Sequence, residues 1–231
     1  MIDCYVICIL DNPLSEASAA RLAETMPSNA NLHNFDAVTP KRNFARARRF
    51  NLTWNYPWSG TEIDLQSGLK KTAYPTAVKE KRIACFLSHH SLWEKCVQLQ
   101  KPIIIHEHDA RYINEDPLPL EMWEKSGYDI IGLNDPRGAT RRALDYHNAV
   151  THAPHEIVRP PWIDEQTVPQ GIAGNSSYWI NPKGAQLMLD LTKEYGMWPN
   201  DALMCRQLVP RLGQSRRYWT YVQGIASTTS L

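Results

Sequence analysis

The sequence predicts an α/β protein whose central sheet is mostly parallel and flanked by helices. Residues 2–10 and 103–105 are short apolar runs rich in β-branched side chains, which is typical of strands that are covered on both faces. Residues 14–26 place apolar side chains at helical spacing, and residues 31–38 have the pattern of a further strand. Strand, helix and strand at this spacing form a βαβ unit, for which a nucleotide at the strand ends is the default ligand.

Length and composition limit the classes of protein to which the chain can belong. With 231 residues, of which 43% are hydrophobic, it can bury a substantial core. Its formal net charge of +1 excludes a strongly basic or acidic protein, so any polyanion must meet a local patch. Five scattered cysteines without a C-x-x-C motif do not form a disulfide framework, and the first residues lack the basic segment of a signal peptide. We therefore expect a cytoplasmic protein with no integral membrane association.

The remaining elements follow from the same two periodicities. Helices are expected where apolar side chains recur at helical spacing, at residues 81–100, 182–195 and 202–208. Strands are expected in short apolar or aromatic runs, at residues 128–133, 177–180 and 216–223, and the last of these should close the sheet. Residues 136–170 are rich in Pro, Arg and His without any period, which indicates a long functional loop of the kind that covers ligands.

Acidic and imidazole side chains follow the apolar run at residues 103–105. A buried parallel strand cannot keep Glu107 and Asp109 in its middle without partners, so both must emerge at its carboxyl edge, where open α/β sheets bind ligands. In extended backbone these two carboxylates lie on one face and His108 on the other. Two hard oxygen ligands placed in this way suit Mg²⁺ or Mn²⁺ bridged to a diphosphate. Solvated charges at a strand end are the alternative.

A zinc hydrolase is a rival interpretation of the same segment, because His106, His108 and Asp109 are close in sequence. Such sites generally have the pattern H-x-H-x-D-H. Here the Asp comes one residue early and Arg111 stands where the last His belongs, so the pattern favours a hard cation.

Basic and aromatic side chains are interleaved in a second segment. Its basic residues are Lys41, Arg42, Arg46, Arg48 and Arg49, and its aromatic residues are Trp54, Tyr56 and Trp58. Such a mixture can hold phosphates while it stacks on bases or on sugar faces. A solvated basic helix beside a hydrophobic loop is the alternative.

Two blocks of the chain resemble the signature of glycosyltransferase family 25. The first is R-I-A-C-F-L-S-H-H-S-L-W-E-K-C at residues 82–96, and the second is I-I-I-H-E-H-D-A at residues 103–110. The resemblance continues at residues 34–38 and 180–185, and therefore covers most of the chain. The family usually has Glu-Asp-Asp where this chain has Glu-His-Asp at residues 107–109, a variant associated with phage-encoded members.

The resemblance implies a GT-A fold in a single domain. Residues 1–110 would form the nucleotide-sugar-binding half, and residues 111–231 would form the acceptor and catalytic half. It also implies UDP-glucose or UDP-galactose as donor, Mn²⁺ or Mg²⁺ as cofactor and inversion at the anomeric carbon. The residues expected around the donor are Asn12, Asp36, Ser88, His89, Glu107 and Asp109.

Inversion needs a cation site for the departing UDP and one general base for the acceptor hydroxyl. Asp109 is the expected direct metal ligand, with Glu107 on the ribose or on a metal-bound water. Because no histidine is available near the C-terminus, waters or Gln223 would complete the ligand set. Asp201, at the start of a short helix, matches the place of the base in inverting GT-A enzymes, and Asp135 is the second candidate. A helix cap is the alternative role for Asp201.

The acceptor has two alternatives. The family resemblance points to a hydroxyl on lipooligosaccharide or another glycan. The Glu-His-Asp variant and the basic segment lean slightly to 5-hydroxymethylcytosine in phage DNA, which an enzyme must grip by its phosphates. The residues expected at the acceptor are Arg46, Arg48, Arg49, Trp54 and Trp58, with Arg137, Arg141 and Arg142 in the long loop. An inactive module that binds sugar nucleotide or glycan is the alternative from another class.

Overall fold

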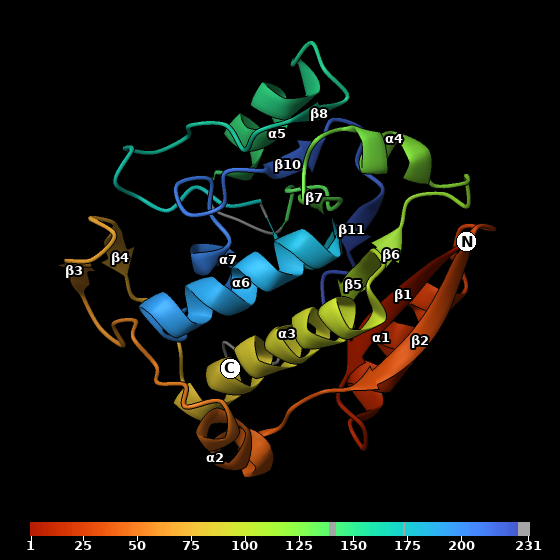
Figure 1. The fold of residues 1–231 in the computed structure, drawn as a ribbon. Helices are drawn as coiled ribbons and strands as arrows, with labels where there is room; N and C mark the ends of the chain where they lie inside the picture. The colour runs from red at the N-terminus through yellow and green to blue at the C-terminus, as the bar shows by residue number, and fades with distance from the viewer. Residues whose placement is uncertain (139–141, 173, 226–231) are drawn as a thin grey trace.

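The computed structural model describes residues 1–138, 142–172 and 174–225, which form a central seven-stranded sheet with helices on both faces (Figure 1). In spatial order the strands are β2 (Ala30–Asp36), β1 (Ile2–Cys8), β5 (Ile103–Glu107), β9 (Ser177–Ile180), β7 (Ile130–Gly132), β10 (Leu212–Ser215) and β8 (Ile157–Val158). The first three run parallel, whereas β9 lies antiparallel between β5 and β7. The predicted α/β class is confirmed, and β9 makes the sheet mixed.

The helices divide between the two faces of the sheet. They are α1 (Pro13–Ala23), α2 (Pro40–Arg49), α3 (Lys79–Leu99), α4 (Leu120–Lys125), α5 (Ala143–Thr151), α6 (Pro182–Tyr195) and α7 (Asn200–Leu203). Ile103 and Ile105 of β5 pack with α3 and α6, whereas Ile104 between them packs with α1 and α4, as the alternation of strand side chains requires. No helix in these described residues has the length and apolar character needed to cross a bilayer.

Local signals set the ends of two predicted helices. Asn12 caps α1, because its side-chain oxygen accepts a hydrogen bond from the backbone N–H of Ser15 at 3.1 Å. Asn181 caps α6 in the same way through the backbone N–H of Gly184 at 2.9 Å. The chain leaves α6 at Gly196, whose φ of 80° is a conformation that other residues rarely adopt.

Residues 216–223 do not close the sheet, so this prediction was wrong. They contain β11 (Thr220–Val222), which pairs with β6 (Ala110–Tyr112) in a separate two-stranded sheet. The place in the central sheet belongs to β10, whose sequence L-G-Q-S has little apolar character. Its buried Gln214 side chain donates to the carbonyl oxygen of Gly132 in β7 at 2.9 Å. A polar side chain that is satisfied by a distant strand leaves no periodic signal in the sequence.

Residues 136–170 are not a continuous loop, because α5 and β8 lie within them. Tyr146 and Val150 of α5 pack with Tyr218 in a small separate cluster. β8 pairs only two residues with β10. Elements this short produce no recognisable period, which explains why the sequence predicted a loop.

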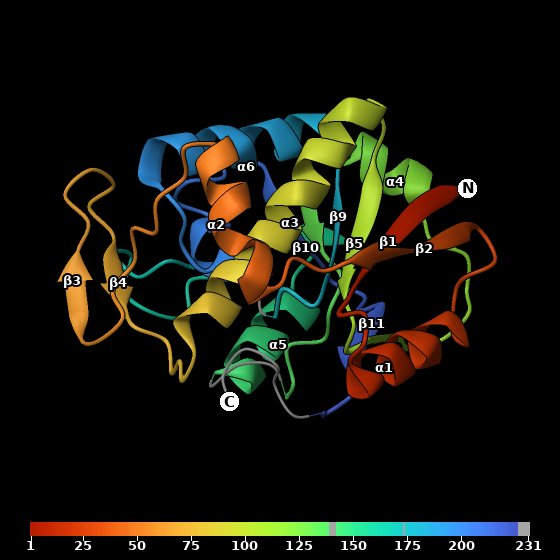
Figure 2. The same cartoon turned by 90° about the horizontal axis from the view of Figure 1, so that it is seen from below.

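A hairpin of β3 (Thr61–Ile63) and β4 (Lys70–Thr72) lies at the edge of the molecule, away from the central sheet, in both views (Figure 1, Figure 2). The backbone N–H of Lys70 donates to the carbonyl oxygen of Thr167 at 2.8 Å. This bond ties the hairpin to the segment between β8 and β9.

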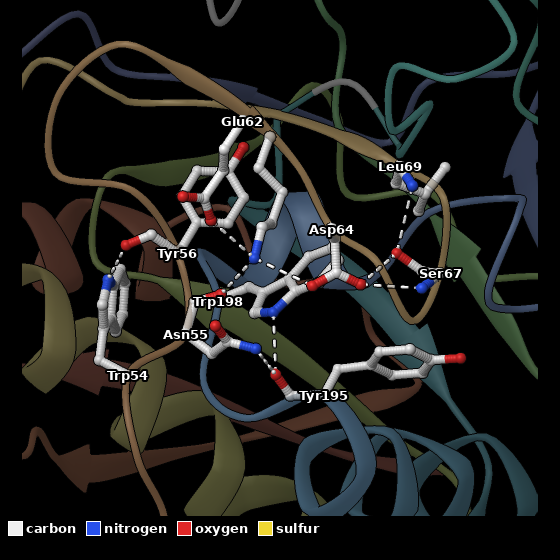
Figure 3. Close-up of polar contacts among 10 residues, drawn as sticks. Trp54, Asn55, Tyr56, Glu62, Asp64, Ser67, Leu69, Tyr195 and Trp198 are labelled. Atoms are coloured by element: carbon white, nitrogen blue, oxygen red, sulfur yellow. Dashed lines mark hydrogen bonds and ion pairs between the residues drawn. The ribbon is translucent and has the colours of Figure 1, made fainter.

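A buried lysine anchors the same hairpin. Lys71 is only 1% exposed, and its amine lies 3.0 Å from Glu62 Oε1, from Asp64 Oδ1 and from the backbone oxygen of Asn55 (Figure 3). The amine also lies 5.0 Å from the ring centre of Trp198. Two carboxylates compensate the buried charge, and the amine lies over the ring of Trp198, which comes just before Pro199, the N-cap of α7.

Candidate active site

A cleft with a volume of about 690 Å³ lies at the carboxyl ends of β1, β2 and β5. Helices α3 and α7 and the segment after β11 supply other parts of its lining. Its polar side chains come from seven separate segments and are those of Asn12, Thr39, Tyr74, Lys81, Arg82, Cys85, Ser88, His89, Glu107, His108, Asp109, Asn175, Ser176, Asn200 and Asp201. The cleft therefore brings together the predicted acidic pair and the predicted general base.

Glu107 ends β5 and is held by a chain of buried hydrogen bonds. The indole N–H of Trp93 donates to Tyr178 Oη at 2.9 Å, and Tyr178 Oη lies 2.9 Å from His89 Nδ1. His89 Nε2 lies 3.2 Å from Glu107 Oε1, where an N–H can donate to the carboxylate. Burial alone would raise the pKa of Glu107, but the hydrogen bond and charge of His89, together with the charges of His108 and Arg82, outweigh it and leave the pKa below its usual value. Glu107 is therefore a fixed negative charge.

Asp109 lies next to this charge and has unsatisfied binding capacity. Burial and the nearby Glu107 raise the pKa of Asp109 to about 7. Its Oδ1 atom is buried and has no hydrogen-bond partner among the described residues. Two carboxylates that repel each other, one of them with a buried oxygen that has no hydrogen-bond partner among the described residues, fit a hard divalent cation that would neutralise both.

The residues of the zinc-hydrolase interpretation do not converge. His106 is fully buried, and its Nε2 lies 3.1 Å from Tyr112 Oη, outside the cleft. His108 lines the cleft, but its Nδ1 lies 2.7 Å from Ser15 Oγ at the start of α1. Each imidazole thus has a separate local partner.

Asp201 lies in α7 with its side chain in the cleft. The N-cap of α7 is Pro199, so the alternative role of Asp201 as a helix cap is wrong. Tyr74 Oη donates to Asp201 Oδ2 at 3.2 Å. Burial raises the pKa of Asp201, and the positive charge of Arg82 opposes the rise only in part. A raised pKa makes the carboxylate a stronger base at neutral pH.

Asp135 has the opposite environment. It is buried, does not line the cleft and receives hydrogen bonds from Nε and Nη2 of Arg137 at 3.1 and 2.6 Å. Burial would raise the pKa of Asp135, but these bonds outweigh it and lower the pKa. Asp135 is therefore a poor candidate for a base.

Arg142 of the long loop does not line the cleft. Arg142 pairs with Asp145 at 2.9 Å and with Asp164 at 3.2 Å. Arg141 lies outside the described residues.

Three residues expected around the donor have local structural roles. Asn12 lines the cleft as the cap of α1. Ser88 lines it too, and its hydroxyl accepts from the backbone N–H of Val38 while it donates to a carbonyl one turn earlier in α3. Asp36 is exposed, pairs with Arg42 at 2.8 Å and does not line the cleft. Ser88 thus positions the loop after β2.

Gln223 is not free to complete a metal site. Its side-chain oxygen accepts from Arg21 Nε at 2.6 Å, and its side-chain nitrogen donates to the carbonyl oxygens of Ser18 and Ala110 at 3.0 Å. Both ends of the amide are occupied, so this alternative was wrong.

None of the residues expected at the acceptor lines the cleft; these are Arg46, Arg48, Arg49, Trp54 and Trp58. Arg46 pairs with Glu94 of α3 at 2.7 Å, which joins α2 to α3. Trp54 and Trp58 stack on each other with ring centres 4.6 Å apart. Contact of these residues with an acceptor stays a prediction.

The sequence did not single out Tyr74, Lys81 or Arg82, although all three line the cleft. The guanidinium of Arg82 lies 5.3 Å from the ring centre of Tyr74, and its Nε donates to Thr76 Oγ1 at 2.9 Å. Arg82 opens the R-I-A-C block, but nothing in its sequence spacing marks it as a cleft residue.

Gly171 fixes the position of α7. A Cβ atom at this residue would lie 2.6 Å from the carbonyl oxygen of Asp201 and 3.0 Å from that of Met204. We expect Gly171→Ala to push α7 and its carboxylate away, and to lower the turnover number more than the affinity for the donor. Steady-state kinetics with a circular dichroism control measure this, and equal effects on both constants would contradict it.

Comparison with known proteins gives one family. The model of glycosyltransferase family 25 (LPS biosynthesis protein) matches residues 14–204. No curated protein sequence matches the chain. One similar solved structure is the apo form of mouse xyloside xylosyltransferase 1, with 10% sequence identity and a TM-score of 0.45 over 91% of this chain and 83% of that chain. The family match contains the acidic pair and Asp201.

Proposed function

The chain belongs to glycosyltransferase family 25 and is a glycosyltransferase, and from this premise we propose that it transfers glucose or galactose from a UDP-sugar to an acceptor hydroxyl with inversion and with Mn²⁺ or Mg²⁺. The observation that carries the proposal is that Glu107, Asp109 and Asp201 line one cleft. Inverting transfer needs a site for the charged leaving group and a base for the acceptor in the same space.

The acidic pair and two cationic side chains support the donor half of this proposal. A cation bound by Glu107 and Asp109 would neutralise the charge that develops on the departing diphosphate. Lys81 and Arg82 line the same cleft and bring positive charge to it. His89 keeps the Glu107 carboxylate oriented throughout the reaction.

Asp201 supports the acceptor half. Tyr74 holds Oδ2 of this carboxylate, which leaves Oδ1 to accept the proton of the acceptor hydroxyl. The acceptor oxygen then bonds to the anomeric carbon as the bond from sugar to phosphate breaks. The proton goes to Asp201, and the negative charge leaves with UDP.

We favour a glycan hydroxyl as the acceptor. Two arginines of α2 are paired with carboxylates, Arg42 with Asp36 and Arg46 with Glu94. These pairs compensate part of the positive charge that a DNA-binding site would need. Arg48 and Arg49 are exposed and remain the basis of the DNA alternative. The family description as an LPS biosynthesis protein also supports a glycan.

A reducing compartment such as the cytoplasm is part of the proposal. All five cysteines are free thiols. Four of them are buried, which fits small core side chains rather than structural disulfides.

One assay separates the alternatives. The protein is incubated with UDP-glucose or UDP-galactose and with lipooligosaccharide, 5-hydroxymethylcytosine DNA or unmodified DNA. The mass of each product is then measured by mass spectrometry. We expect one hexose on the glycan only. Transfer to hydroxymethylated DNA that weakens steeply with salt would establish the DNA alternative instead. If the protein binds the UDP-sugar but neither transfers the hexose nor hydrolyses the UDP-sugar in the presence of metal, it is an inactive binding module.

A further inference from the structure

The cleft contains a second set of metal-ligand atoms, which shares Glu107 with the proposed hard-cation site and adds Cys85, a residue that the proposed transfer does not use. Cys85 Sγ, a ring nitrogen of His89 and a carboxylate oxygen of Glu107 all lie within 4.8 Å of one another. We propose that these three side chains bind a thiophilic divalent cation such as Zn²⁺ or Cd²⁺, and that this ion excludes the hard cation because both need Glu107. Only the exclusion rests on the proposed function.

The spacing of the ligands supports this site. Cys85 and His89 are four residues apart on α3 and share one face of the helix. His89 Nε2 and Glu107 Oε1 are 3.2 Å apart. A tetrahedral zinc ion with bonds of about 2.0–2.1 Å places two such ligands about 3.3–3.4 Å apart. The spacing of these two atoms therefore fits a shared metal ion, and Cys85 Sγ lies within 4.8 Å of the ligand atoms of both residues.

The orientation of the imidazole is also fixed. His89 is fully buried, and Tyr178 Oη lies 2.9 Å from its other ring nitrogen, Nδ1. When Nε2 binds a metal, the ring proton lies on Nδ1, where it can donate to this phenol oxygen. Trp93 holds the phenol in turn at 2.9 Å. Metal-binding histidines usually have such an outer partner.

The site is accessible from the cleft, and its ligands select one class of metal. All three side chains line the 690 Å³ cleft, and Cys85 and Glu107 are partly exposed to it. A fourth position remains open to water from the cleft. When the metal binds, the Cys85 thiol loses its proton to solvent and the sulfur becomes the ligand. A thiolate selects Zn²⁺ or Cd²⁺ over Mg²⁺ or Mn²⁺.

Titration of the purified full chain with Cd²⁺, without donor or acceptor, tests the site. We expect ultraviolet absorption from sulfur-to-cadmium charge transfer that saturates at one equivalent. Cys85→Ser should weaken binding by more than about 100-fold, because loss of an outer partner alone costs about 10- to 100-fold. Cys96→Ser is the matched control and should keep the absorption. Cys96 lies on the same helix, but its thiol donates to the carbonyl oxygens of Lys101 and Ile180.

Two results would overturn the site: no charge-transfer absorption in the wild type, or unchanged absorption in Cys85→Ser. Cys85→Ala and a circular dichroism spectrum guard against loss of fold in the variant. Tyr178→Phe should weaken Cd²⁺ binding by about 10- to 100-fold, and an unchanged affinity would contradict the role of this phenol.

The exclusion has its own measurement. Zn²⁺ should release bound Mn²⁺ from the wild type, seen as free Mn²⁺ by electron paramagnetic resonance, and should not release it from Cys85→Ser at the same concentration. Retention of both ions by the wild type would refute the exclusion. Cd²⁺ binding involves no sugar, so an enzyme that binds Cd²⁺ but transfers no hexose refutes the proposed function alone.

Discussion

Asp201→Asn is expected to lower the rate of hexose transfer by roughly 10²- to 10⁴-fold, the usual contribution of a positioned general base. Affinity for the UDP-sugar should remain at the wild-type value, because the carboxylate faces the acceptor in our proposal. An asparagine of nearly the same shape still accepts the hydrogen bond from Tyr74, so α7 should keep its position. Single-turnover rates and calorimetric binding of the donor measure the two quantities separately.

Asp135→Asn is the matched control for this experiment. Asp135 is bound by Arg137 and does not line the cleft, so its replacement should leave transfer close to the wild-type rate. A loss of transfer in Asp135→Asn but not in Asp201→Asn would move the role of base to Asp135. Loss of donor affinity together with rate in Asp201→Asn would make Asp201 a structural or donor-site residue.

The pH dependence of the wild-type transfer rate should reflect the ionisation of Asp201. Burial raises the pKa of Asp201. As the solution is acidified, the transfer rate should therefore begin to fall at a pH above the usual pKa range of aspartate. In Asp201→Asn this acid limb should be absent from the residual rate.

The parts of the fold that the sequence predicted have strong local signals. Strand β1 is a nearly continuous apolar run, α3 is a long periodic helix, and α6 is bounded by Asn181 and Gly196. β10 and β11 were missed or misplaced because their positions depend on partners more than fifty residues away. A buried glutamine that bonds a distant carbonyl looks like a surface residue in the sequence.

The candidate site divides in the same way. Glu107 and Asp109 were predictable because charges directly after a buried strand must emerge at its edge. The place of Asp201 came from the family resemblance. The positive charges at α2 suggested a ligand site, but Asp36 and Glu94 compensate two of them, and the pairing of Arg46 with Glu94 spans forty-eight residues.

Asp109→Asn should separate cation binding from folding. In the cation-free wild type, burial and Glu107 raise the pKa of Asp109 to about 7, from 3.8 for an unperturbed aspartate. The folded chain therefore binds this proton more tightly than the unfolded chain between these two values. Stability should fall as the pH rises through this window, because the folded state must then carry two adjacent buried charges.

Asparagine keeps the size of the side chain and removes that charge. The cation-free variant should have a flatter dependence of Tm on pH than the wild type, and a higher Tm at pH 8. Mg²⁺ or Mn²⁺ should raise the Tm of the wild type at pH 8 and leave that of the variant unchanged, because a ligand stabilises only the state that binds it. Differential scanning calorimetry with and without the cation measures both effects.

Transfer by Asp109→Asn should fall by roughly 10²- to 10³-fold, since a positioned cation contributes several kcal/mol to charge stabilisation in the transition state. Asp116→Asn is the surface control, because Asp116 is exposed and pairs with Arg217. It should change neither the transfer rate nor the effect of the cation on Tm. If Asp109→Asn transferred hexose at the wild-type rate and with the wild-type cation dependence, the acidic pair would not bind the metal. A lower Tm of the variant at pH 8 would show that Asp109 is not the strained carboxylate that its surroundings indicate.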